Sequence, residues 1–267
     1  MSNQQCRTRV TNMTSHLSSA QRERAGELLA RARNRTQMRL DNYEDGGVER
    51  ELSSFFNGIA GEYQRIGVLE VAVGDLSASR EAFESSTTYY QRSAEKDVFP
   101  VQSSRQLMQG MYTGLVAGSD ETVQLADSML SLADTEDCSP GEHNADRYFL
   151  SWCLAGAICA DVSVEGLTGL ETVNESKPVP HADYGQAMLS IARGIRNADQ
   201  ATLQAGIETM LAFHEQDSHS DNVVDQAMSV QATALLVLVQ SRGYDISVDS
   251  LYIPIRLVEQ AVERIRL

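Results

Sequence analysis

Apolar residues recur at steps of three and four along most of the chain, a spacing that predicts helices with one buried face. The pattern is clearest between Tyr184 and Gln216, where two amphipathic segments meet at Asn197-Ala198-Asp199. The carboxylate of Asp199 is suited to cap the second segment, because it can accept hydrogen bonds from the unpaired amides of a first helical turn. This stretch predicts a helical hairpin, and most of the remaining chain repeats it.

Capping and turn residues predict where the other helices begin and end. Ser18-Ser19-Ala20-Gln21 has the form of a capping box and predicts a helix that runs to about Asp41. In Ser139-Pro140-Gly141-Glu142, a serine at N-cap, a proline at N1 and a glutamate at N3 predict a second sharp helix start. Further helices are expected over 48–73, 76–93, 105–116, 121–133, 164–173 and 223–239, and a closing helix is expected from Asp249-Ser250. His214 to Asn222 is expected to be a polar loop.

Aspartates in the predicted turns recur at a roughly constant interval. Successive members of this set lie between 38 and 46 residues apart: Asp75, Asp120, Asp161, Asp199 and Asp245. Intervals of this length with two helices each are typical of helical-repeat arrays. We therefore predict an all-α fold of stacked antiparallel helical hairpins, an irregular tetratricopeptide-like array, as a single domain over residues 18–267. Residues 1–17 are polar and are expected to form a flexible arm.

Three glycines lie four residues apart within one predicted hairpin. Gly110, Gly114 and Gly118 would share a helix face. In a membrane this spacing would suggest helix dimerisation. In a water-soluble repeat it predicts that two helix backbones pack closely, at a cost of about 1 kcal/mol per glycine in helix propensity.

The charge balance is strongly acidic. The chain has 267 residues, of which 22 are basic and 37 acidic, for a net charge of -15, and only Lys96 and Lys177 are lysines. An acidic surface can capture a cationic partner. However, a scarcity of lysine beside abundant carboxylate is typical of a protein from a halophilic archaeon, which must stay hydrated in molar salt. We favour the halophilic interpretation, which weakens any inference from charge to binding.

The same totals bear on partners and location. Direct binding of nucleic acid is not expected, because it requires a basic surface and the one arginine-rich segment, between Arg22 and Arg39, is typical of a salt-bridged helix face. No secretory signal or membrane span is predicted. The four cysteines (Cys6, Cys138, Cys153 and Cys159) contain no CxxC pair and are expected to stay reduced. We therefore predict a cytoplasmic protein.

No motif predicts catalysis, a cofactor or a metal. His214 and His219 resemble a zinc-protease HExxH, but they are five residues apart, so they would not share a helix face for one ion. Gly166 to Gly169 lacks the lysine and the spacing of a phosphate-binding loop. The sequence has no GxSxG elbow and no recognisable cysteine–histidine pair. We predict that the protein is not an enzyme, although a helical enzyme without a recognisable motif is a third possibility.

Three passages together resemble a known family. They are residues 72–92, with a Gly-Asp hairpin; residues 192–216, a second hairpin that ends near a histidine; and residues 234–259. The last passage is the most telling, with Arg242-Gly243, Asp249-Ser250 and then Tyr252-Ile253-Pro254. In this order they resemble the immunity protein 49 family of polymorphic toxin systems. The middle hairpin departs from the pattern, because Asn197-Ala198-Asp199 replaces a glycine-aspartate turn.

The resemblance implies a non-enzymatic protein that binds a co-encoded toxin domain and neutralises it by occlusion. The alternative is a helical-repeat adaptor for a peptide or a regulatory protein. Two acidic loops are the candidate partner-binding sites, although solvated loops of a halophilic protein would have the same composition. The first contains Asp134, Glu136, Asp137 and Glu142; the second contains Glu215, Asp217, Asp221 and Asp225.

Overall fold

The protein is all-α over the part of the chain that the structure, a computed structural model, describes: residues 16–48, 51–97 and 100–267. The predicted fold class is therefore confirmed. The helices are α1 (Ser19–Glu44), α2 (Leu52–Val73), α3 (Leu76–Glu95), α4 (Pro100–Ala117), α5 (Glu121–Thr135), α6 (Ala145–Cys159), α7 (Val164–Asn174), α8 (His181–Asn197), α9 (Gln200–Asp217), α10 (Val223–Ala227), α11 (Val230–Ser241) and α12 (Ile255–Arg264).

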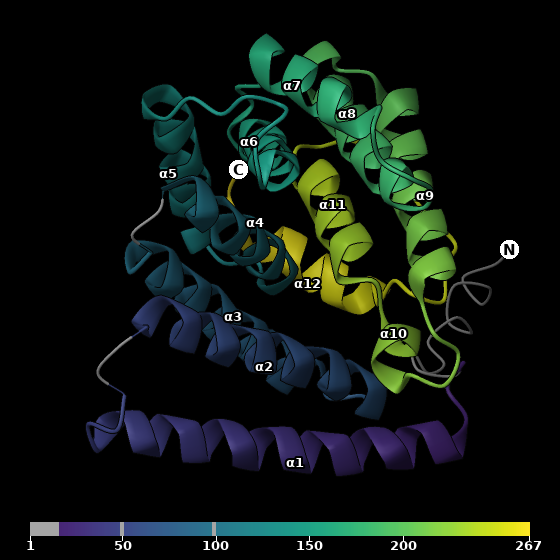
Figure 1. Cartoon of the computed structure of the whole chain (residues 1–267). Helices are drawn as coiled ribbons and strands as arrows, with labels where there is room; N and C mark the ends of the chain where they lie inside the picture. Colours follow the sequence, from purple (N-terminus) through teal and green to yellow (C-terminus); the bar gives the residue numbers. More distant parts are fainter. Residues whose placement is uncertain (1–15, 49–50, 98–99) are drawn as a thin grey trace, which may run out of the picture.

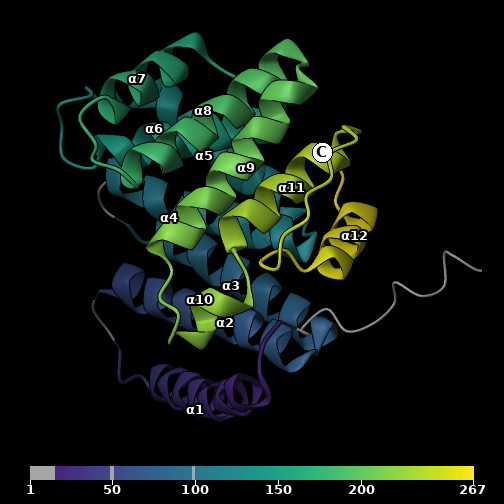
Figure 2. The ribbon, with the colours of Figure 1, turned by 90° about the vertical axis from the view of Figure 1, so that its right-hand side faces the viewer.

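The helices are arranged around α11, which lies at the centre of the molecule (Figure 1). Helices α1, α2 and α3 form one end, α7, α8 and α9 form the other, and α11 packs against α4, α9 and α12 between them (Figures 1 and 2). Leu235, Leu236 and Val237 of α11 have no exposed surface. A helix that is apolar on every side must be buried on every side, which explains this central position.

Two helical hairpins have the predicted form. In the turn between α2 and α3, Gly74 adopts a φ of 91°, and the Asp75 carboxylate accepts a hydrogen bond from the Ala78 amide at 3.0 Å. In the turn between α8 and α9, Ala198 adopts a φ of 51°, and Asp199 accepts from the amides of Ala201 and Thr202. Asp199 is thus the predicted N-cap. Asp120, Asp161 and Asp245 lie near turns but do not cap a helix through their side chains.

The capping box at Ser18 is confirmed, whereas the helix start predicted at Ser139 is wrong. The Ser18 hydroxyl accepts from the Gln21 amide, and the Gln21 side chain accepts from the Ser18 amide. At the second position only half of the box forms, with the Glu142 carboxylate accepting from the Ser139 amide. Asn144 then adopts a left-handed conformation with a φ of 67°, which ends the isolated turn, so α6 begins only at Ala145.

Three predicted boundaries in the C-terminal half are also wrong. The helix expected over 223–239 breaks at Met228-Ser229, where the Ser229 amide donates to the Tyr252 carbonyl at 2.9 Å instead of continuing α10. The closing helix begins at Ile255, after Pro254, and not at Asp249. The expected loop over 214–222 begins later than predicted, because α9 continues to Asp217.

Gly110 and Gly114 of α4, and Gly118 directly after it, pack closely against neighbouring helices, as their spacing predicts. A Cβ added at Gly110 would lie 2.9 Å from a Leu125 methyl group, and one at Gly114 would lie 2.4 Å from the Thr122 hydroxyl. Gly118 has a φ of 68° and lies against the backbone of Ala261 in α12. These glycines bring α4 against α5 and α12.

The arginine-rich helix α1 is fixed to α2 by ion pairs. Arg33 pairs with Glu70, a carboxylate that is only 2% exposed, and Arg35 pairs with Glu62 at 2.6 Å. Arg24 pairs with Glu27 within α1. These contacts account for several of the arginines as a salt-bridged helix face.

The described end of the predicted N-terminal arm contacts the rest of the protein. Of the predicted arm, residues 1–15 lie outside the described residues, while Leu17 is buried and the His16 ring donates to the Gln226 carbonyl at 2.9 Å.

The stretch Val223–Ser241 is long and apolar enough by composition to cross a membrane, but 72% of it is buried within the protein. A core helix passes the same test, so this is weak evidence for a membrane span.

Candidate functional site

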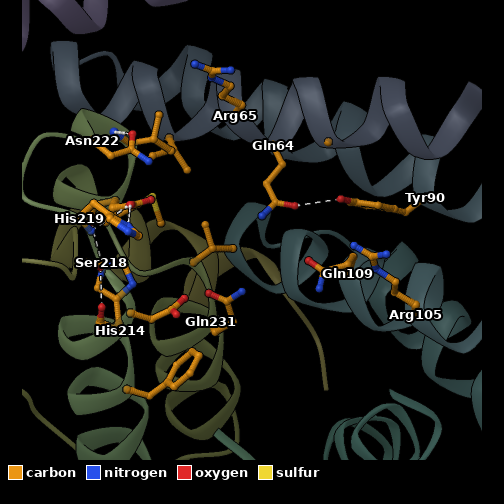
Figure 3. A pocket seen from close by; sticks show the side chains of 18 of the residues that line it. Gln64, Arg65, Tyr90, Arg105, Gln109, His214, Ser218, His219, Asn222 and Gln231 are labelled. Atoms are coloured by element: carbon orange, nitrogen blue, oxygen red, sulfur yellow. Dashed lines mark hydrogen bonds and ion pairs between the residues drawn. The ribbon is translucent and has the colours of Figure 1, made fainter. Parts of the chain in front are cut away.

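A large cleft, which we call the main cleft, lies between the α2–α4 helices and the segment that connects α9 to α11. Its volume is about 890 Å³. Helices α2, α3 and α4 contribute one set of side chains, and the end of α9, α10 and the start of α11 contribute the other. In Figure 3 the labelled residues His214, Ser218, His219 and Asn222 lie on one side and Arg105 with Gln109 on the other, below the helix that carries Gln64 and Arg65.

The α2–α4 side of the cleft carries positive charge and amide groups. Arg65 of α2 and Arg105 of α4 line it, and neither makes an ion pair or a hydrogen bond among the residues that the structure describes. The Nε of Arg65 is buried without a hydrogen-bond partner. Gln64 extends from α2 toward the cleft and accepts a hydrogen bond from the Tyr90 hydroxyl at 3.1 Å (Figure 3). Burial raises the pKa of Tyr90 to about 12, despite the opposing effect of Arg105, so this hydroxyl remains a donor at neutral pH.

The α9–α10 side carries two carboxylates and two histidines. The His214 ring donates from Nε2 to the Asp225 carbonyl at 2.9 Å and packs edge-on against Tyr252. Burial lowers the pKa of His214, and the nearby carboxylates of Asp225, Asp217 and Glu215 only partly offset this effect. His214 is therefore neutral at physiological pH. It serves to join the end of α9 to α10.

His219 lies beyond the end of α9 and is highly exposed. Its amide donates to the Asp225 carboxylate at 3.2 Å, and its ring lies 3.7 Å from the same carboxylate. Over the described part of the chain, no group of three or more histidine, cysteine, aspartate or glutamate side chains is placed to hold a metal ion. Both histidines contact Asp225, His214 through its carbonyl and His219 through its carboxylate.

The second predicted acidic loop borders this cleft in part. Asp217, in the last turn of α9, and Asp225, in α10, line the cleft, whereas Glu215 and Asp221 do not. Asp217 makes no ion pair among the described residues, and Asp225 is engaged with His219. The cleft therefore presents carboxylates on one side and arginines on the other, without an ion pair between them in the structure.

The first predicted acidic loop borders a smaller cavity of about 460 Å³. Glu136 and Asp137 line this cavity, whereas Asp134 lies in the last turn of α5 and Glu142 caps the turn at Ser139. Helices α6 and α7 supply most of the remaining lining. Nothing in the structure brings the two acidic loops into one site.

The arginine side of the main cleft was missed at the sequence level. Asn57, Gly61, Gln64, Arg65 and Val68 recur at helical spacing, so they share one stripe of α2. A mainly polar stripe on a helix with large apolar faces is a usable signal for a cleft. Arg105 gives no such signal, because its place opposite α9 depends on the packing of segments far apart in the sequence.

Comparison of the chain with protein-family models, with curated proteins and with solved structures finds no match.

Proposed function

We propose that the chain is an immunity protein that binds the toxin domain encoded beside it and neutralises that domain by occlusion, without catalysis. The observation that carries the proposal is the main cleft, which is preformed and holds arginines and carboxylates that do not neutralise one another. The resemblance of the Gly-Asp hairpin, the α8–α9 hairpin and the 242–254 segment to the immunity protein 49 family supplies the toxin as the partner.

The physical argument concerns the cost of unpaired charge. An arginine held at a half-buried position has lost part of its hydration, and a partner carboxylate restores the lost interaction with specific geometry. Arg65, which is half-buried with an unpartnered Nε, offers this on the α2–α4 side, and the exposed Arg105 adds a second cation there. Asp217 offers a carboxylate to a cation of the partner. Opposite charges on two sides of one cleft fix the orientation of an inserted segment, which is how complementary interfaces gain specificity.

The test is a calorimetric titration, in a buffer rich in potassium, against the C-terminal toxin domain encoded beside this gene. We expect one-to-one binding that abolishes the activity of that domain. The double variant Arg65→Glu/Arg105→Glu should weaken binding by about 30-fold or more, which corresponds to the 2 kcal/mol or more typical of a desolvated charge pair.

A matched control variant has the same net charge as Arg65→Glu/Arg105→Glu. Arg31 and Arg196 are exposed and lie outside the cleft, so Arg31→Glu/Arg196→Glu changes the total charge equally and should leave the affinity within about threefold. Equal weakening by both double variants would refute the cleft as the binding site. Absence of binding by the folded wild-type protein would refute the immunity function.

The alternative function is that of an adaptor for an extended peptide. One feature favours it: amide side chains from Asn57, Gln64, Gln109 and Gln231 line the cleft, and such groups pair with a peptide main chain. Under this alternative the protein would bind a peptide ligand and have no effect on the neighbouring toxin domain. The neutralisation assay separates the two functions.

A further inference from the structure

The cavity of about 460 Å³ between α6, α7 and the chain after α5 combines an aromatic wall with an acidic rim. Trp152 and Phe149 stack with their ring centroids 6.2 Å apart, and Tyr148 meets Trp152 edge-on at 5.9 Å. Val164, at the start of α7, lines the same cavity and is 56% exposed. We define Tyr148, Phe149 and Trp152 as the aromatic wall, and Val164 lies beside it.

Two glycines of α7 allow the wall to form. A Cβ at Gly169 would lie 2.1 Å from the Phe149 ring, and one at Gly166 would lie 3.2 Å from the Trp152 indole. Each glycine costs about 1 kcal/mol in helix propensity compared with alanine. These two positions therefore place both rings directly against the α7 backbone and leave Trp152 half-buried at the cavity.

The rim of the cavity is acidic and lacks a cation. Glu136, Asp137 and Glu165 line it, no basic residue does, and none of these three carboxylates makes an ion pair with any residue that the structure describes. Burial raises the pKa of Tyr148 to about 12, and the negative charges of Asp137, Glu136 and Asp134 add to this effect. The Tyr148 hydroxyl donates to the Glu136 carbonyl at 2.8 Å, which holds this part of the rim against the wall.

We propose that this cavity receives an arginine side chain from a protein partner. The aliphatic stem of an arginine would pack against Trp152 and Val164, and its guanidinium would reach the carboxylates of the rim. Arginine fits better than lysine, because its planar fork can engage two carboxylates at once and is less strongly hydrated than an ammonium. The inference deepens the proposed function, since it rests on the existence of a protein partner, but its test does not require the toxin.

The test uses the only tryptophan of the chain as a reporter. Protein labelled with ¹⁵N gives a single indole resonance, from Trp152, and is titrated with the peptide acetyl-Leu-Arg-Leu-amide. We expect a saturable shift of this resonance with millimolar affinity. The matched peptide with citrulline, which has the same shape without the charge, should bind at least tenfold more weakly.

Variants then assign the acidic rim. Asp137→Asn/Glu165→Gln removes two exposed carboxylates and should weaken the arginine peptide at least threefold. The control Asp249→Asn/Glu263→Gln removes two exposed carboxylates away from the cavity and should not change its affinity. Absence of a shift in the folded protein, or an equal response to the citrulline peptide, would overturn the proposal. An equal response to a peptide with lysine in place of arginine would overturn the choice of arginine. Because the peptide and toxin titrations are separate, a failure here is distinguishable from failure of the immunity function.

Discussion

The close packing of α4 against its neighbours predicts that a side chain added at Gly114 destabilises the protein. Gly114 lies in the interior of this helix, and a Cβ there would lie 2.4 Å from the Thr122 hydroxyl and 3.3 Å from a Thr87 methyl group. Both threonines are fully buried. The Thr122 hydroxyl donates to the Ser119 carbonyl at 2.6 Å, so it cannot move away without losing that hydrogen bond.

We expect Gly114→Ala to lower the free energy of unfolding by about 1 to 5 kcal/mol. Overpacking of a core costs about 1–3 kcal/mol. Loss of the buried Thr122 hydrogen bond adds about 1–3 kcal/mol where the side chain is displaced. The gain of about 1 kcal/mol in helix propensity offsets part of this cost.

Gly26→Ala is the matched control, because it makes the same substitution within α1, where nothing lies within 4 Å of the added carbon. This variant should gain about 0.5–1 kcal/mol in stability. The assay is urea unfolding followed by circular dichroism, with all variants in the same salt. In the Gly114→Ala background, Thr122→Ala should recover part of the loss, a non-additivity that a double-mutant cycle measures.

Two outcomes would refute the reasoning. If Gly114→Ala were as stabilising as Gly26→Ala, α4 and α5 would not pack as closely as the structure places them. If the effects of Gly114→Ala and Thr122→Ala were strictly additive, the contact between these two residues would not be the cause of the loss.

Three further predictions concern other parts of the fold. Burial lowers the pKa of His214, so its ring binds a proton less readily in the folded protein than in the unfolded chain, and the free energy of unfolding should fall as the pH drops below about 6.5. In urea unfolding between pH 7.5 and 5.5, His214→Gln should make this fall smaller. An unchanged dependence on pH would contradict the prediction. Burial raises the pKa of Cys153 to about 12, so at pH 8 a thiol reagent should modify this residue only after the protein unfolds. Peptide mass spectrometry measures the modification. Rapid labelling of Cys153 in the folded protein would contradict the prediction. Ser229→Ala removes the side chain that accepts from the Ala232 amide at the start of α11 and should cost about 1 kcal/mol, again by urea unfolding, with a change near zero as the contrary result.

The features that sequence predicted well are those fixed by neighbouring residues. The capping box at Ser18 and the aspartate cap at Asp199 depend on amides two or three residues away. Asp75, predicted as a turn residue, caps α3 in the same way. The apolar pattern of α11 determines that it is buried, whatever surrounds it. These local rules were sufficient for an all-α fold and for most helix boundaries.

The boundaries that sequence predicted wrongly depend on distant contacts. The break before α11 exists because the Ser229 amide bonds to the Tyr252 carbonyl, and no local pattern in an apolar run signals such a partner. The start at Ser139 failed for a related reason. The Glu136 carbonyl accepts from Tyr148, which ties the chain after α5 to α6, and the left-handed Asn144 then separates the turn at Ser139 from that helix.

The main cleft separates two explanations of the chain's acidity. An excess of carboxylates at the surface is what a halophilic protein requires, and the two acidic loops fit that explanation on composition alone. It does not explain why Arg65 and Arg105 line a cleft without ion pairs, in a chain with many more acidic than basic residues. Molar salt screens long-range attraction but has less effect on a desolvated contact, so a partner carboxylate on these arginines would remain effective where steering is lost. We therefore expect the affinity for the partner to depend more on Arg65 and Arg105 than on the number of surface carboxylates.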